Sequence, residues 1–436
     1  MPDPLTKKPR NREHIAWYMY DFGNSAYAAV ILLAVYSAYF KGTVVGGAEG
    51  SRYWGIAVGI AMLSVAIISP ILGAIADFTA SKKRFLFIFS AITWVFTGLL
   101  FFVEKGDILI GMVFFIIAEI GYRSGQVFYN SLLPEIAEPE EMGRVSGNGW
   151  AIGSFGGILI LLILLPLIVI FEGTLIVRLS LVFTSIYFAA SAIPAWLWIK
   201  EKAVAKELPE GGTYLSVAFV RLGKTIKALG SYKDFLRFIF AFLVYNDGIL
   251  MALNFASIIG AVMFGMEQTE LIIFMIIVQI TSVIGAYLAG LLGKKLGFKR
   301  TLIYSITMMA LVVTSMIFAQ NVTQFYIIGA LAGFALTGVQ SVSRTMVSYF
   351  APEGRSAEFY GIFAISGRTS SFIGPTIYGF LAFEAFKYFE NNRGLSTILA
   401  EQAGQRVALG SIVIFLVIGL LILLGVKDPT KEYTDQ

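Results

Sequence analysis

The sequence predicts an all-α membrane protein of twelve transmembrane helices, arranged as two pseudo-symmetric six-helix bundles. Three observations predict it: an apolar composition, a regular series of long apolar runs, and a weak internal repeat. Hydrophobic residues make up 57% of the 436 residues, charged residues only 14%, and the mean hydropathy is +0.77. These values lie far from the balance of a soluble domain and place the chain among integral membrane proteins.

Apolar runs of about 18 to 26 residues are long enough to cross a bilayer as helices. They divide into six spans in each half of the chain. The expected spans are 15–40, 54–76, 85–103, 108–130, 146–171, 175–199, 235–263, 270–292, 301–320, 325–349, 357–383 and 407–426. A polar connection at 384–406 is expected to form an exposed turn near Gly394, and no function is assigned to it.

The internal repeat relates two connections that are rich in cations. The segment 77–84 (DFTASKKR) recurs in altered form at 293–300 (GKKLGFKR), 216 residues further along. Duplicated membrane halves of this size are typical of transporters. We expect an N-terminal bundle at 1–199, a cytoplasmic linker with an amphipathic helix at 200–234, and a C-terminal bundle at 235–436.

The distribution of cations predicts the orientation of the chain. Most of the 33 Lys and Arg residues fall in the two tails and in alternate connections, so both termini are expected in the cytoplasm. The first apolar run is long and lacks a small-residue cleavage site, which favours a retained helix over a signal peptide. We expect a multi-pass protein of the plasma membrane, or of the vacuolar membrane in a eukaryote, that is monomeric and surrounded by lipids.

The inventory of residues argues against several classes of function. The chain has no cysteine and one histidine, so it offers no thiolate metal site and no thiol nucleophile. It also lacks a phosphate-binding glycine loop and a Ser-His pairing. Its cations do not form the basic soluble face that nucleic acid requires. The sequence therefore predicts a protein that is not an enzyme, needs no cofactor or metal, and binds no nucleic acid.

Polar residues inside the spans are the candidate substrate-binding residues. A charge at the centre of a bilayer costs at least about 2.5–3.5 kcal/mol on insertion scales, so each one is expected to face protein, water or substrate. The candidates are Asp21, Asn24, Glu119, Arg123, Asn246, Asp247, Gln340 and Arg368.

Each charged candidate allows a structural and a functional interpretation. Glu119 and Arg123 are four residues apart and can neutralise each other, or they can line a cavity where substrate or a proton competes for one partner. Asp21 has no cation one turn away, and burial disfavours its charged form, so it is a candidate for proton coupling or a hydrogen-bonded structural carboxylate. Asp247 holds a comparable place in the second half. Arg368, shortly before a Gly-Pro break, can hold a carboxylate.

The first repeated segment resembles a known signature. The run Gly73-Ala-Ile-Ala-Asp77 with Lys82-Lys83-Arg84 is similar to the motif between helices 2 and 3 of the major facilitator superfamily, although Phe78 and Ser81 depart from it. In that superfamily the aspartate and the cations latch the cytoplasmic side. The expected gating residues are Asp77, Lys82, Lys83, Arg84, Arg344 and Glu358.

Three longer stretches resemble the vacuolar amino-acid effluxer-like family of this superfamily. They are 17–27 (WYMYDFGNSAY), 130–147, and 357–375, which contains AEFYG, SGR and GP. The resemblance spans essentially the whole chain and implies alternating access and, by analogy with eukaryotic members, export of neutral amino acids. A weaker resemblance, carried by Asp21-Phe-Gly-Asn24, is to sugar-cation symporters.

These observations together predict a secondary active transporter for a small polar solute, most simply an amino acid, coupled to protons or another ion. Charges of both signs in the spans suit such a substrate. Three alternatives stay open at this point: a lipid or lysolipid flippase, a sugar-cation symporter on the same fold, and a channel or non-transporting receptor.

Overall fold

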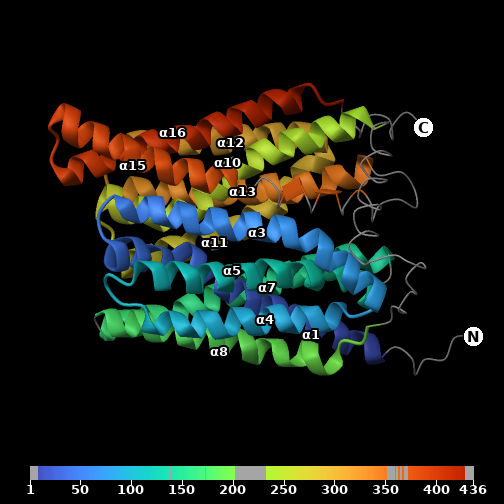
Figure 1. The fold of residues 1–436 in the computed structure, drawn as a ribbon. Helices are drawn as coiled ribbons and strands as arrows, with labels where there is room; N and C mark the ends of the chain where they lie inside the picture. Colours follow the sequence, from blue (N-terminus) through green and yellow to red (C-terminus); the bar gives the residue numbers. More distant parts are fainter. Residues whose placement is uncertain are drawn as a thin grey trace, which may run out of the picture. The chain divides into compact units, whose positions relative to one another are not determined.

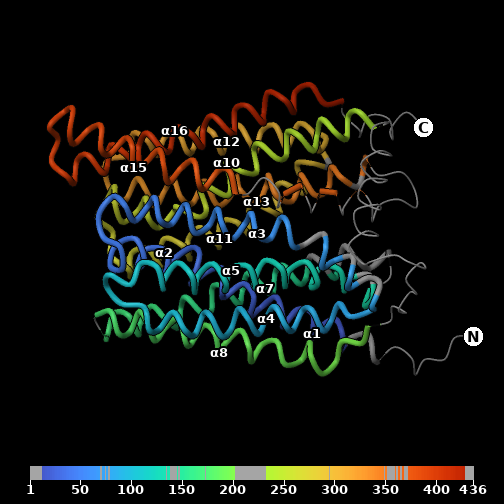
Figure 2. Tube along the Cα trace, viewed as in Figure 1, coloured from blue at the N-terminus to red at the C-terminus, as the bar shows by residue number. Residues whose placement is uncertain are grey.

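The computed structural model describes residues 8–137, 139–171, 173–201, 232–350, 359, 362–363, 366–367 and 372–427. Figure 1 shows their helices, and Figure 2 follows the same helices as a Cα trace in chain order. No strand occurs in these ranges. Most of the predicted linker at 200–234, with its amphipathic helix, lies outside the described residues.

Long helices account for nearly all of the described chain, and the first span is the exception because two π-helical turns interrupt it. The elements are α1 (Lys8–Tyr27), η2 (Ala28–Ala34), α2 (Tyr36–Tyr39), η3 (Phe40–Val45), α3 (Glu49–Thr79), α4 (Lys82–Leu99), η4 (Leu100–Phe102), α5 (Ile108–Ser131), α6 (Leu133–Ile136), α7 (Pro139–Ile170), α8 (Thr174–Trp198), α10 (Lys233–Phe264), α11 (Gln268–Leu296), α12 (Phe298–Phe318), α13 (Val322–Phe350), α15 (Ile373–Arg393) and α16 (Thr397–Leu424).

The predicted spans correspond closely to these helices. Among the described residues, eleven helices are long and apolar enough to cross a membrane, from Arg12–Val45 to Thr397–Leu424. The remaining predicted span, 357–383, is described mainly in its second part, as α15. The prediction of an all-helical, twelve-span membrane fold is confirmed.

The chain forms two compact units. Unit 1 comprises residues 1–36 and 64–223, and unit 2 comprises residues 37–63 and 224–436. In unit 1, α1 packs against α7 and α8, and α4 packs against α5. In unit 2, α10 and α15 both pack against α16, and α11 packs against α13 (Figure 1). The domain limits expected from the sequence stay a prediction.

Aromatic stacking and one close helix approach fix α1 within unit 1. The Trp17 ring stacks on Tyr129 of α5 with centroids 4.2 Å apart, and its indole N–H donates to the Tyr129 carbonyl at 3.1 Å. On the other side of α1, a Cβ placed on Gly156 of α7 would lie 2.8 Å from the Phe22 carbonyl carbon, so only glycine fits there. These contacts hold the polar face of α1 in a defined orientation.

The expected polar connection at 384–406 is largely helical, which corrects the sequence interpretation. Helix α15 continues to Arg393, the chain turns at Gly394 with φ +66°, and α16 already begins at Thr397. The predicted position of the turn at Gly394 agrees with the structure, but the connection is shorter than predicted. The polar residues at the start of α16 lowered the local hydropathy, and they are buried in contacts within unit 2 instead of being exposed in a loop.

Candidate functional site

Two helical faces of unit 1 bring polar side chains together. Asp21 and Asn24 of α1 are three residues apart and so share one face of that helix, with Tyr27 a further turn along. On α5 the polar residues follow the spacing 119, 122, 123 and 126, which also describes one face. The Tyr27 and Tyr122 rings stack with centroids 4.4 Å apart and join the two faces. We call this group the unit 1 polar cluster; its members are Asp21, Asn24, Tyr27, Glu119, Tyr122, Arg123 and Gln126.

The centre of the unit 1 polar cluster is an ion pair within α5. The Arg123 Nε–H donates to Glu119 Oε1 at 2.7 Å, and the exposed fractions of the two side chains are 21% and 0%. The Arg123 guanidinium also lies over the neighbouring Tyr122 ring, 5.2 Å from its centroid. The expected pairing across one turn is therefore present.

Three buried polar atoms of the cluster have no hydrogen-bond partner within the described part of the chain. They are Glu119 Oε2, Asn24 Oδ1 and the Tyr27 hydroxyl oxygen. Leaving a buried polar atom unsatisfied costs about 1–3 kcal/mol. Glu119 Oε2 and Asn24 Oδ1 are acceptors, one on each helical face, so a donor group of a ligand would gain a hydrogen bond at either atom; the Tyr27 hydroxyl, which interacts with Glu119, is a donor of the protein itself.

Asp21 lies at the edge of the same cluster. A Cβ placed on Gly153 of α7 would lie 2.9 Å from the Asp21 Cγ, so the absence of a side chain at 153 makes room for this carboxylate. Asp21 is half-buried and within electrostatic reach of both Tyr122 and Tyr129. The Asp21 carboxylate thus lies at the edge of the cluster, against Gly153 of α7.

Unit 2 contains a second polar cluster on α10. The Gln340 side-chain amide of α13 donates to Asn246 Oδ1 at 3.0 Å, and the Asn246 amide donates to the Gly367 carbonyl at 3.4 Å. The neighbouring Asp247 is buried and accepts the backbone N–H of Gly374. Its Oδ1 has no partner among the described residues. Gln340 and Asn246 are therefore in contact, with Asp247 next to Asn246 in α10, and their role in binding substrate stays a prediction.

The expected gating cations at the start of α4 make contacts inside unit 1. Lys82 Nζ donates to Glu135 Oε1 at 2.9 Å, and Lys83 Nζ donates to the Ile199 carbonyl at 2.8 Å. The backbone N–H groups of both lysines donate to the Glu201 carboxylate at 2.8 and 3.2 Å. A carboxylate at a helix N-terminus is stabilised by the free N–H groups and the helix dipole.

The other gating candidates are placed only in part. Arg84 is exposed on α4, and Arg344 is exposed on α13. Asp77 lies in α3, but its side chain is not among those that the structure describes. Glu358 and the substrate candidate Arg368 fall outside the described residues, so their roles stay predictions.

Sequence reasoning missed the aromatic and long-range members of these sites. Tyr27 and Tyr122 could have been found, because they share helical faces with Asn24 and Glu119. Glu135 and Glu201 lie more than 50 residues from Lys82, and no local spacing points to them.

The fold and the buried charged clusters define a class of protein, the membrane transporters of the major facilitator superfamily, and comparisons with known proteins agree. A model of the family described as "Vacuole effluxer Atg22 like" matches residues 51–384. The chain belongs to this family. It is not an enzyme.

Curated relatives fit the same class. An uncharacterised transporter of the superfamily, YxiO of Bacillus subtilis, is 25% identical over 437 residues, covering 98% of this chain and 97% of the relative. Autophagy-related protein 22 of Coccidioides immitis is 24% identical and covers 78% of this chain and 69% of its own length.

Solved structures share the fold at low identity. An inward-facing, unoccupied bacterial homologue of the human lysosomal transporter Spinster has a TM-score of 0.73 and 15% identity, covering 97% of both chains. The nucleoside transporter NupG has a TM-score of 0.68 and 14% identity, covering 95% of this chain and 99% of its own. A D-xylose-proton symporter follows at 0.65 and 14%, covering 96% and 98%.

Proposed function

We propose that this protein is a proton-coupled secondary transporter of a small polar solute that carries an ammonium group, in the simplest case an amino acid. The observation that carries the proposal is the buried Glu119–Arg123 pair with its unsatisfied acceptor Glu119 Oε2, together with the unsatisfied Asn24 Oδ1 on the α1 face that the Tyr27–Tyr122 stack joins to α5. Membership of a family described as vacuole effluxers supports export of a metabolite.

The chemistry of the unit 1 polar cluster suits a zwitterion. An ammonium group can donate to Glu119 Oε2 and to Asn24 Oδ1, two acceptors that no described protein group satisfies. Arg123 uses its Nε–H for Glu119, so its terminal N–H groups can bind a carboxylate. A ligand that has both an ammonium and a carboxylate can therefore separate Glu119 from Arg123, because each of the two charges then pairs with a group of the ligand.

In this proposal Asp21 takes up the coupling proton. Its carboxylate lies beside the cluster, against Gly153, where it can respond electrostatically to a bound cation. Asp247 is the corresponding candidate in unit 2. Placing the termini in the cytoplasm and the protein in the plasma membrane belongs to the same proposal and rests on the cation distribution along the sequence.

A ligand screen is the first test of the substrate class. Purified protein is heated with amino acids, sugars, nucleosides or lysolipids at two pH values, because a ligand that binds only the folded state raises the melting temperature. We expect stabilisation by one or more amino acids, and the same compounds should exchange across proteoliposomes in labelled counterflow. Stabilisation by sugars or lysolipids alone would replace the amino acid by that class.

The variant Asp21→Asn tests the coupling role. We expect loss of uptake driven by a pH gradient, while counterflow, which needs no net proton movement, continues. Asp107→Asn is the matched control, because Asp107 lies in the connection before α5, where its side chain accepts the exposed Glu104 backbone N–H. An unchanged pH dependence of uptake in Asp21→Asn would remove Asp21 from the coupling mechanism.

A further inference from the structure

One segment of the N-terminal half packs with the C-terminal helices. The chain leaves unit 1 after Tyr36, and residues 37–63, comprising most of α2, η3 and the first half of α3, belong to unit 2. We call residues 37–63 the crossing segment. It lies one membrane crossing after the N-terminus, and the start of α16 lies one crossing before the C-terminus. Both therefore reach the membrane face opposite the two termini.

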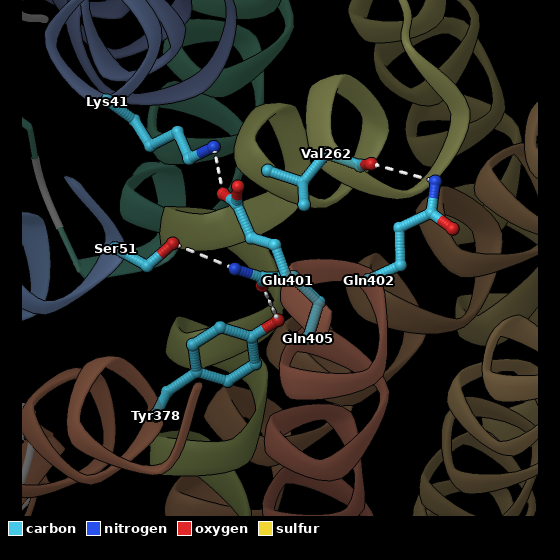
Figure 3. A network of polar contacts seen from close by, with 7 residues as sticks. All are labelled: Lys41, Ser51, Val262, Tyr378, Glu401, Gln402 and Gln405. Atoms are coloured by element: carbon cyan, nitrogen blue, oxygen red, sulfur yellow. Dashed lines mark hydrogen bonds and ion pairs between the residues drawn. The ribbon is translucent and has the colours of Figure 1, made fainter. Parts of the chain in front are cut away.

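A buried ion pair joins the crossing segment to α16. Lys41 of η3 donates to Glu401, and the exposed fractions of the two side chains are only 10% and 14% (Figure 3). In a buried pair each charge has lost much of its hydration, and the attraction between the charges compensates for that loss. The contact is therefore stable only while both charges are present.

A chain of hydrogen bonds runs beside the ion pair. The Tyr378 hydroxyl donates to Gln405 Oε1 at 2.8 Å, and the Gln405 amide donates to Ser51 Oγ at 2.8 Å (Figure 3). All three side chains are buried. One helical turn further along α3, the Trp54 indole N–H donates to the Asn254 carbonyl at 2.8 Å. Three polar contacts thus fasten this segment to α10 and α16, and Tyr378 links α15 to the same Gln405 side chain.

The backbones of α3 and α15 also approach each other closely. A Cβ placed on Gly379 would lie 2.7 Å from the Ser51 carbonyl and 3.2 Å from the Gly55 Cα, so the two backbones touch directly. Small residues permit such an approach between membrane helices. Next to this approach, the Arg52 guanidinium of α3 lies over the Phe383 ring of α15, 4.1 Å from its centroid.

The backbone of the first span offers a place to bend. The π-helical segments η2 and η3 flank the four-residue helix α2, and the boundary between the units falls inside α2. Wide π-helical turns are frequent at functional sites and at kinks in helices. The change of unit therefore coincides with the irregular part of the helix.

We propose that the crossing segment is a hinged cover on unit 2, held closed by the Lys41–Glu401 ion pair and released when the pair separates. Separation exposes Lys41 and Glu401 to water, and their recovered hydration offsets the lost attraction. An apolar contact of the same size would regain no favourable hydration when it opens. The ion pair therefore keeps the free energies of the closed and open forms close together, which a reversible gate requires.

Thiol labelling tests this proposal without a substrate. The chain has no cysteine, so Ser51→Cys introduces a single thiol at a completely buried position in the otherwise native protein. In detergent micelles a maleimide reaches both faces of the protein, and its rate of reaction reports how often the cover opens. We expect slow labelling of Ser51→Cys alone, and about tenfold or faster labelling when Lys41→Met or Glu401→Gln is added, because each leaves one buried charge without a partner.

Two further variants complete the design. Lys387→Met removes the exposed Lys387–Glu384 pair of α15 and should leave the labelling rate unchanged. The charge exchange Lys41→Glu with Glu401→Lys restores an ion pair and should return labelling to nearly the slow rate, even where a single variant folds poorly. Equal labelling in the parent and both single variants would overturn the proposal. So would fast labelling of a charge-exchange protein that melts at the temperature of the parent.

Discussion

Two variants of the α5 ion pair, one with a single substitution and one with both members replaced by methionine, separate a structural role of the pair from a role in transport. Glu119→Gln alone removes one charge and leaves Arg123 without its counter-ion. Loss of one partner from a buried pair costs about 3–5 kcal/mol, and the partial exposure of Arg123 reduces this to about 2–3 kcal/mol. The ratio of folded to unfolded protein should therefore fall about 30- to 140-fold.

The double variant Glu119→Met with Arg123→Met removes both charges together. Exchanging a buried ion pair for apolar residues of similar volume is often neutral or stabilising. We expect its free energy of unfolding to stay within about 1 kcal/mol of the parent, while labelled counterflow is lost because the two groups that we propose to bind the zwitterion are gone. Stability without transport would show that the pair is kept for function.

Unfolding of the purified protein in detergent, followed by tryptophan fluorescence, gives the stability. Counterflow in proteoliposomes gives the transport rate. Glu384→Gln is the matched control, because both members of its pair with Lys387 are exposed, at 60% and 46%, and its loss should cost less than about 0.5 kcal/mol. The reasoning fails if the double methionine variant transports as the parent does, or if Glu119→Gln is no more destabilising than Glu384→Gln.

Two smaller changes test contacts elsewhere in the fold by the same unfolding measurement. Lys82→Met breaks the largely buried pair with Glu135 and should cost about 1–3 kcal/mol, whereas Lys387→Met at an exposed pair should cost under about 0.5 kcal/mol; equal losses would contradict the burial argument. Trp54→Phe keeps the ring but loses the hydrogen bond to the Asn254 carbonyl, so we expect a loss of about 1 kcal/mol, and unchanged stability would show that the bond contributes nothing.

The sequence predicted those features that depend on local spacing. The spans follow from the lengths of apolar runs, and the Glu119–Arg123 pair follows from an interval of four residues on a helix. The neighbouring candidates Asn246 and Asp247 needed only the rule that polar groups inside a membrane face protein. In each case the decisive information lies within about one helical turn or one run of residues.

Long-range pairings could not be predicted in this way. Lys41 and Glu401 are 360 residues apart, and they meet only because α3, α15 and α16 pack together. Polar residues at the start of α16 lowered the hydropathy and made a buried helix resemble a loop. Hydropathy measures the side chains alone, and it does not show that a polar group finds its partner on another helix.

Because residues 37–63 pack with unit 2, the chain cannot be divided at its middle into two independent pieces. A chimaera that joined the first half of this protein to the second half of a relative would place Lys41 against a foreign residue at the position of Glu401. Such hybrids should assemble only when the acceptor supplies an acid there, so compatibility between halves is decided by matched charges at two distant positions.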